Sequence, residues 1–166
     1  MALSPDRGIQ VHNKIFKTRE SLSNRGAGKG ITIRLFGRSD GQIAGRRVFE
    51  VIPFILIENA IKYSPDNQPI DIIFQEMKEQ ICVTFRNVGP SLDESEIERI
   101  FDMGRRGRNA EAARVPGYGI GLHFAKELVE QHHGGTIEFG QSGEVRMFTG
   151  VEHRITEIVL KLPRVR

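Results

Sequence analysis

Residues 117–135 read GYGIGLHFAKELVEQHHGG, a glycine-rich loop that opens a helix-forming stretch and closes on a glycine pair. Gly117, Gly119 and Gly121 allow the backbone to come close to a ligand, and the free N–H groups at a helix start favour negative charge. We therefore expect a helix over residues 118–133 with an anion, such as a phosphate, at its beginning. The alternative is that these glycines only form a tight loop.

The glycine spacing excludes the two common phosphate-binding loops. The dinucleotide fingerprint needs G-x-G-x-x-G directly after a strand, whereas residues 117–121 give G-x-G-x-G after an arginine-rich loop. A Walker loop needs G-x-x-x-x-G-K-[ST], and the nearest match, at Gly28-Lys29, has a serine at the first position and a glycine at the last. We interpret the segment around Gly28 as a flexible linker.

A second stretch, VFEVIPFILIENAIKYSP, predicts a buried helix within residues 46–63, with Pro53 as a kink or a late start. Near its end four polar-tipped residues fall within an arc of about 140° on the helix. They are Glu58, Asn59, Lys62 and Tyr63. A phosphate with a divalent cation would compensate their burial, because Asn can bind Mg²⁺, Lys can bind phosphate and Glu can act as a base. The alternative is that this helix end emerges into solvent.

The remaining pattern mixes strands with helices. A short acidic helix is expected at 93–101, and alternating or β-branched runs predict strands at 31–36, 70–75, 81–86, 136–140 and 154–162. Two of these runs form a hairpin around MKEQ. The fold class is therefore α/β: a two-layer α/β sandwich with a mixed, mostly antiparallel sheet covered on one face by helices.

Composition places the chain among soluble globular proteins. The 166 residues are 39% hydrophobic and 27% charged, which allows a sizeable core without disulfide or metal staples. Cys82 is the only cysteine, so an internal disulfide and a cysteine zinc cluster are excluded and a reducing, cytoplasmic setting is expected. The N-terminus does not resemble a signal peptide, and no apolar run is long enough to span a bilayer.

Together the two stretches resemble the histidine kinase catalytic domain, of the ATPase superfamily that includes DNA gyrase, a heat-shock chaperone and the mismatch-repair ATPases. ENAIKYSP resembles its asparagine box, N-A-x-K-[YH]-[ST], and GYGIGL its second glycine box. ERIFDMGRRG resembles its phenylalanine box, with Phe101 as the phenylalanine. The similarity continues through GGTIEF, with one extra histidine, and covers residues 30–163 in all.

The resemblance implies an ATP-binding domain at residues 30–166, preceded at 1–29 by an extension or the stub of a dimerisation helix or linker. It implies that Asn59 holds Mg²⁺, that Glu58 and Asn59 are catalytic, and that Leu122 packs the helix start. The residues implied to bind ATP are Asn59, Lys62, Tyr63, Asn87, Gly89, Arg105, Arg106, Gly117, Gly119, Gly121 and Leu122. Ile55 stands where water-splitting relatives carry a glutamate, which favours phosphoryl transfer to a protein.

One box departs from the family pattern. The first glycine box is D-x-G-x-G, and its aspartate recognises the adenine amino group. Here Asn87 replaces that aspartate and Ser91 replaces the second glycine, while Gly89 remains. An asparagine carbonyl can still accept from an amine, but a neutral hydrogen bond is weaker than a charged one, and serine is a poor fit wherever φ must be positive.

Residues 103–116, MGRRGRNAEAARVP, stand where the family has its ATP lid loop. Arg105 and Arg106 are expected to neutralise the β- and γ-phosphates, as arginines do in other phosphoryl-transfer sites. Glycines at 104, 107 and 117 would serve as hinges. The alternative is a basic loop that contacts no nucleotide.

A histidine kinase also needs a substrate histidine, and none of the five histidines is followed by an acid. We therefore expect a catalytic domain that does not phosphorylate itself alone and that acts on a histidine-containing dimerisation domain, in cis or in trans, with a response regulator downstream. We expect an isolated monomer with no nucleic-acid partner and no membrane contact; membrane anchoring of the full-length protein stays open. The alternatives are an anti-sigma-factor-type serine kinase and a degenerate nucleotide-binding scaffold that regulates a partner kinase.

Overall fold

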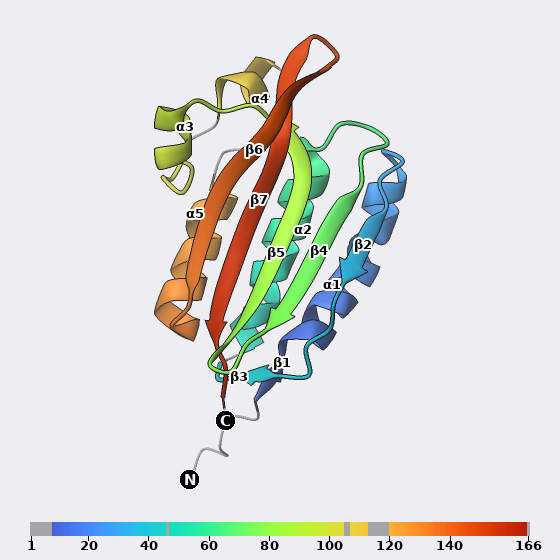
Figure 1. The fold of residues 1–166 in the computed structure, drawn as a ribbon. Coiled ribbons are helices and arrows are strands. Elements are labelled where there is room, and N and C mark those ends of the chain that lie inside the picture. Colours follow the sequence, from blue (N-terminus) through green and yellow to red (C-terminus); the bar gives the residue numbers. More distant parts are fainter. Residues whose placement is uncertain (1–7, 46, 105–106, 113–119, 166) are drawn as a thin grey trace.

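A computed structural model describes residues 8–45, 47–104, 107–112 and 120–165. It consists of a sheet in one layer and helices in the other (Figure 1). The sheet has the strand order β2-β4-β5-β7-β6. Its members are β2 (Ile33–Phe36), β4 (Ile70–Glu76), β5 (Gln80–Pro90), β6 (Thr136–Phe148) and β7 (Val151–Pro163). Only the β2–β4 pair of this sheet is parallel, which confirms the expected two-layer sandwich with a mixed, mostly antiparallel sheet.

Two further strands and seven helical segments complete the described chain. The strands β1 (Ile9–Gln10) and β3 (Gln42–Ile43) form a separate antiparallel pair. The helical segments are α1 (Val11–Ala27), the 3₁₀ turn η1 (Arg47–Glu50), α2 (Val51–Tyr63), α3 (Glu94–Glu98), α4 (Arg108–Ala112), α5 (Gly121–Glu127) and the π-helix η2 (Leu128–His132). Among the described helices, none combines the length and the apolar character needed to cross a bilayer.

Helix α2 begins at Val51, two residues before Pro53. The sequence left open whether Pro53 kinks this helix or marks a late start; in the structure the 3₁₀ turn η1 passes directly into α2 at Val51, so Pro53 is not the start. Pro53 lies in the first turn of α2, where a backbone N–H would have no partner within the helix, so the missing donor costs nothing. The helix is therefore continuous from Val51 to the polar residues at its C-terminal end.

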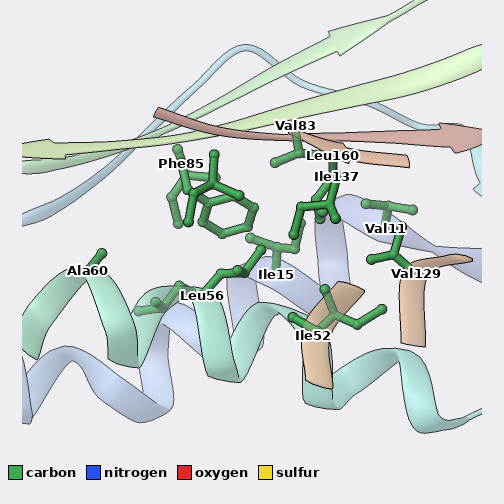
Figure 2. Packing of buried hydrophobic residues seen from close by; sticks show 14 of the residues in the cluster. Val11, Ile15, Ile52, Leu56, Ala60, Val83, Phe85, Val129, Ile137 and Leu160 are labelled. Atoms are coloured by element: carbon green, nitrogen blue, oxygen red, sulfur yellow. The ribbon is translucent and has the colours of Figure 1, made fainter. Parts of the chain in front are cut away.

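The core lies between the sheet and the helices α1, α2 and α5–η2, where Figure 2 shows Ile15 and Leu56 directed toward Phe85 of the sheet. Val11, Ile15 and Leu22 of α1 are buried in this same cluster. Helix α1 thus contributes to the core of the sandwich, although the expected domain division at residue 29 places it outside. That division stays a prediction.

Strand β5 is longer than the sequence predicted. It continues through Asn87 to Pro90, because β7 extends far enough to pair Gly89 with Arg154 and Pro90 with His153. The first glycine box is consequently strand rather than loop. Among described residues other than glycine, only Asn67 and Thr149 have a positive φ, so Ser91 stands at a position that places no such demand on it.

The helix that follows the second glycine box changes its winding before it ends. Helix α5 passes into the π-helix η2, which ends beside the buried His133. A π-turn holds one residue more than an α-turn, so it accommodates one inserted residue without displacing what lies on either side. The extra histidine in HHGG is therefore absorbed as a local π-turn.

Candidate functional site

One cavity of about 270 Å³ opens between the C-terminal half of α2, the end of β5 and the start of α5. Eight of the residues selected from the sequence line it: Glu58, Asn59, Lys62, Tyr63, Asn87, Gly89, Gly121 and Leu122. They come from three elements that are distant in the sequence. Ile55, which stands where a hydrolytic glutamate would be expected, also lines it.

Four of the selected residues cannot be placed. Arg105, Arg106, Gly117 and Gly119 lie outside the described residues. Of the expected lid, the structure describes the parts on either side of them, including the short helix α4. Gly107 and Ala110 from this region line the cavity, so the lid segment does border it.

Three polar side chains of α2 line the cavity without a partner in the part of the chain that the structure describes. Asn59, Lys62 and Tyr63 are half-buried, and none of these side chains makes a hydrogen bond or ion pair with another described residue. Half-buried polar groups are normally satisfied by protein, water or a ligand. An amide oxygen, an ammonium and a phenol around one cavity fit a phosphate-bearing ligand with a hard cation.

Glu58 differs from its neighbours because it has a partner. Its carboxylate accepts from Arg25 of α1 at 2.8 Å, and both side chains are substantially exposed. An ion pair this exposed contributes little to stability. Glu58 therefore remains available at the rim of the cavity, held toward α1.

Asn87 is buried and lines the cavity, with both amide hydrogens engaged. Its Nδ2 donates to Ser64 Oγ at 3.1 Å and to the Val88 carbonyl at 3.0 Å. The Ser64 hydroxyl in turn donates to the Ala60 carbonyl at 2.6 Å, within the last turn of α2. The amide oxygen of Asn87 is left without a partner among the described residues.

The end of α2 is also closed by a residue that the sequence did not single out. The Lys29 ammonium donates to the carbonyls of Ile61 at 2.7 Å, Lys62 at 3.3 Å and Ser64 at 2.5 Å. Burial lowers the pKa of Lys29, against an opposing contribution from Asp66. The interpretation of this segment as a flexible linker was wrong, because Lys29 caps the helix that carries the site.

The opposite wall comes from the long β6–β7 hairpin. Gln141 Nε2 donates to Thr156 Oγ1 at 2.9 Å and to the Pro90 carbonyl at 2.8 Å, and Gln141 Oε1 accepts from the Leu92 N–H at 2.8 Å. A Cβ at Gly89 would lie 2.8 Å from Thr156 Oγ1, so this close approach requires glycine. Gln141 and Thr156 were not predicted from the sequence, because no local pattern marks them.

The phenylalanine box is anchored on α5. Phe101 is half-buried against the core, and Lys126 Nζ lies 5.2 Å from the centre of its ring. His123 Nδ1 lies 3.1 Å from the Phe101 carbonyl oxygen. Leu122 packs against the core, as expected for the start of this helix.

Comparison with known proteins agrees with this arrangement. Residues 46–166 match the family model described as histidine kinase-, DNA gyrase B-, and HSP90-like ATPase. The sensor histidine kinase WalK of Bacillus subtilis is 34% identical over 84 residues, which are 49% of this chain and 14% of WalK. The adaptive-response sensory kinase SasA of Thermosynechococcus vestitus is 30% identical over 105 residues, 63% of this chain and 27% of SasA.

Solved structures show the same fold. The catalytic domain of histidine kinase ThkA superposes with a TM-score of 0.77 at 18% identity, covering 96% of this chain and 98% of that one. The mycobacterial sensor histidine kinase MprB gives 0.76 at 18% identity, covering 96% and 97%. The chain spans less than a third of either curated relative. Since the family model matches most of its residues, the chain belongs to the histidine kinase-, DNA gyrase B- and HSP90-like ATPase family.

Proposed function

We propose that this chain is the ATP-binding catalytic domain of a two-component sensor histidine kinase. It binds Mg²⁺-ATP and presents the γ-phosphate to a histidine on a dimerisation domain. The observation that carries the proposal is a set of polar side chains, Asn59, Lys62 and Tyr63, that have no partner among the described residues and line one cavity with Asn87, whose amide oxygen likewise has no described partner. The relatives named sensor kinases support the same reading.

The two ends of the nucleotide have different partners in this proposal. Asn87 receives the adenine amine, beside Gly89. Lys62 and Tyr63 serve the phosphate and ribose side, and Asn59 supplies an oxygen to Mg²⁺. Arg105 and Arg106, with Gly117, Gly119 and Gly121, complete the phosphate end. When bound, Mg²⁺ neutralises charge on the phosphates, and the chain contributes position and complementary charge.

The proposed acceptor is a protein side chain rather than water. Ile55 lines the cavity one helical turn before Asn59, so an aliphatic side chain stands where a base for water would be needed. Glu58 lies at the rim, where it can orient an incoming imidazole or accept its proton. In-line attack by that imidazole transfers the phosphoryl group to the histidine nitrogen, and ADP leaves.

The partners follow from that chemistry. The histidine is supplied by a dimerisation domain in cis or in trans, and a response regulator receives the phosphoryl group afterwards. ThkA, one of the structural neighbours, has been solved in complex with the response regulator protein TrrA, with a TM-score of 0.72 to this chain at 18% identity. The domain works in the cytoplasm, where its substrate ATP is held, whether or not the rest of the protein is anchored in the inner membrane.

Calorimetric titration with Mg²⁺-ADP tests the nucleotide site. The wild type should bind, Asn59→Ala should lose the magnesium-dependent part of the affinity, and Asn24→Ala, on the exposed face of α1, should bind like the wild type. Absence of binding by the wild type would contradict the proposal. Normal magnesium-dependent binding by Asn59→Ala would remove Asn59 from the site.

Phosphoryl transfer is tested separately with γ-labelled ATP and a histidine-containing dimerisation domain. The expected product is a phosphoprotein that loses its label in acid, because phosphohistidine is acid-labile. Acid-stable label on a serine would instead establish the serine kinase alternative. A domain that binds ATP but labels neither class of acceptor would be the regulatory scaffold.

A further inference from the structure

The amide of Asn87 has a defined polarity, and this has consequences for the base it can accept. Unlike a carboxylate, a primary amide has one end that only donates and one end that only accepts. Asn87 is 8% exposed, and its amide nitrogen lies against protein groups rather than water. Which end faces the cavity is therefore decided by its protein neighbours.

The Val88 carbonyl and the Ser64 hydroxyl both favour the same orientation of the Asn87 amide. Asn87 Nδ2 donates to the Val88 carbonyl at 3.0 Å. If the amide were flipped, Oδ1 would take the place of Nδ2, and two oxygens would face each other there without a proton between them. Ser64 Oγ accepts from Nδ2, and its own proton is committed to the Ala60 carbonyl at 2.6 Å. Both contacts direct Nδ2 into the protein and leave Oδ1 for the cavity.

We propose that Ser64 is a positioning residue that fixes the Asn87 amide with its oxygen toward the bound base, so that the site selects 6-amino purine nucleotides over 6-oxo ones. The inference rests on the proposed nucleotide site. An adenine amine donates to Oδ1, whereas the 6-oxo group of an inosine nucleotide would place an acceptor against an acceptor. An aspartate at this position would accept in either orientation, so only the asparagine needs Ser64 to set its direction.

The connection also links base recognition to helix α2. Ser64 is the C-cap of α2, the helix that carries Asn59, Lys62 and Tyr63, and its N–H donates to the Ala60 carbonyl as well. The Lys29 ammonium donates to the Ser64 carbonyl. Ser64 is thus held through its hydroxyl and N–H by Ala60 of α2 and through its carbonyl by Lys29.

The experiment compares affinities for Mg²⁺-ADP and Mg²⁺-IDP, which carry identical phosphates and differ at position 6 of the base. The wild type should prefer ADP by about tenfold, the size of one hydrogen bond gained against one left unmade. Ser64→Ala should reduce that preference to about threefold or less, mainly by weakening ADP. Ser64→Thr keeps the hydroxyl and should keep the preference. Ser21→Ala, which removes an exposed hydroxyl of α1, is the control.

Ser64→Cys is the second variant, because it keeps a side chain of similar size while its sulfur is only a weak hydrogen-bond acceptor. It should lower the ADP preference, and it serves as the test if Ser64→Ala does not fold. Asn87→Asp should make the preference independent of Ser64. Equal affinity of the wild type for ADP and IDP would overturn the selection while leaving the nucleotide site intact. A Ser64→Ala or Ser64→Cys variant that weakens both nucleotides equally would make Ser64 merely structural. Binding of neither nucleotide by the wild type would overturn the proposed function and this inference together.

Discussion

The ammonium of Lys29 donates to the carbonyl of Ile61 at 2.7 Å, and so the turn that follows helix α1 closes the C-terminal end of helix α2. The last carbonyls of a helix have no partner within it, and a cation at that end also complements the helix dipole. Helix α2 carries four of the polar residues that line the cavity near that end, Glu58, Asn59, Lys62 and Tyr63. The C-terminal end of α2, where the cavity-lining side chains must keep their positions, is therefore the end that Lys29 caps.

Removing this cap should destabilise the fold. Lys29→Met keeps most of the aliphatic stem but leaves the α2 carbonyls without their donor, at an expected cost of about 1–2 kcal/mol in the free energy of unfolding. Urea unfolding measures the difference. Lys17→Met, on the exposed face of α1, is the matched control and should change stability little. Equal effects of the two substitutions would show that the cap contributes nothing.

Stability should fall in mildly acid solution because of His133. Burial, together with the neighbouring His132, lowers the pKa of His133, against an opposing contribution from the backbone of Ala44. A lowered pKa means that the folded state resists a proton that the unfolded state takes up once the pH drops below about 6.5. The free energy of unfolding should therefore decrease between pH 7.5 and pH 5.5, by no more than about 1.4 kcal/mol, the limit that one histidine with an unfolded pKa near 6.5 sets over this range.

Replacing the ring isolates this effect. In His133→Gln the decrease between pH 7.5 and 5.5 should largely disappear, whatever the variant's absolute stability. In His132→Gln, which changes an exposed residue, the decrease should persist. The side chain of His133 packs edge-on against Phe49 with ring centres 5.3 Å apart, so some loss of stability at all pH values is expected in the first variant. An unchanged pH dependence there would assign the effect to another group.

Restoring the family's acid at the base site should tighten nucleotide binding. Asn87→Asp offers a charged acceptor, and hydrogen bonds to charged groups are stronger than neutral ones, so Mg²⁺-ADP affinity should rise by about fivefold. Calorimetric titration of the wild type and of Asn87→Asp with Mg²⁺-ADP measures the change in affinity. Weaker binding would mean that repulsion from the Val88 carbonyl, 3.0 Å from the amide nitrogen, outweighs the added charge.

The wall of the cavity should not tolerate a methyl group at Gly89. The added Cβ would lie 2.8 Å from Thr156 Oγ1 and displace the partner of Gln141, so Gly89→Ala should lower stability by about 1–3 kcal/mol. Thermal unfolding measures it. Gly140→Ala places the same methyl where nothing lies within 4 Å and should be nearly neutral. The double variant Gly89→Ala/Thr156→Ala removes the contact and should recover part of the loss; no recovery would contradict the steric explanation.

Periodic features of the site were predictable because their cause is local. Asn59, Lys62 and Tyr63 share a helix face through the 3.6-residue repeat, and the β4–β5 hairpin follows from two neighbouring alternating runs. The glycine and asparagine boxes were recognisable for the same reason. The extra histidine before the glycine pair was also visible in the sequence. The π-turn at this position could not be predicted from it.

Other features depended on residues that meet only after folding. Asn87 and Ser64 are 23 residues apart, and Lys29 lies 32 residues from Ile61. Nothing in the local pattern of RGAGKG distinguishes a helix cap from a linker. Likewise, the box around Gly89 is a strand only because β7 extends to pair with it, which neither segment shows by itself.

The sequence by itself determined the fold class, the family and the side chains that one helix presents to the cavity, because side-chain periodicity and short motifs are properties of neighbouring residues. Only the tertiary structure decided which end of the Asn87 amide faces that cavity and what holds α2 in place. Those outcomes depend on hydrogen-bond partners from other elements, and the direction of a hydrogen bond is settled only when donor and acceptor lie within about 3 Å of each other.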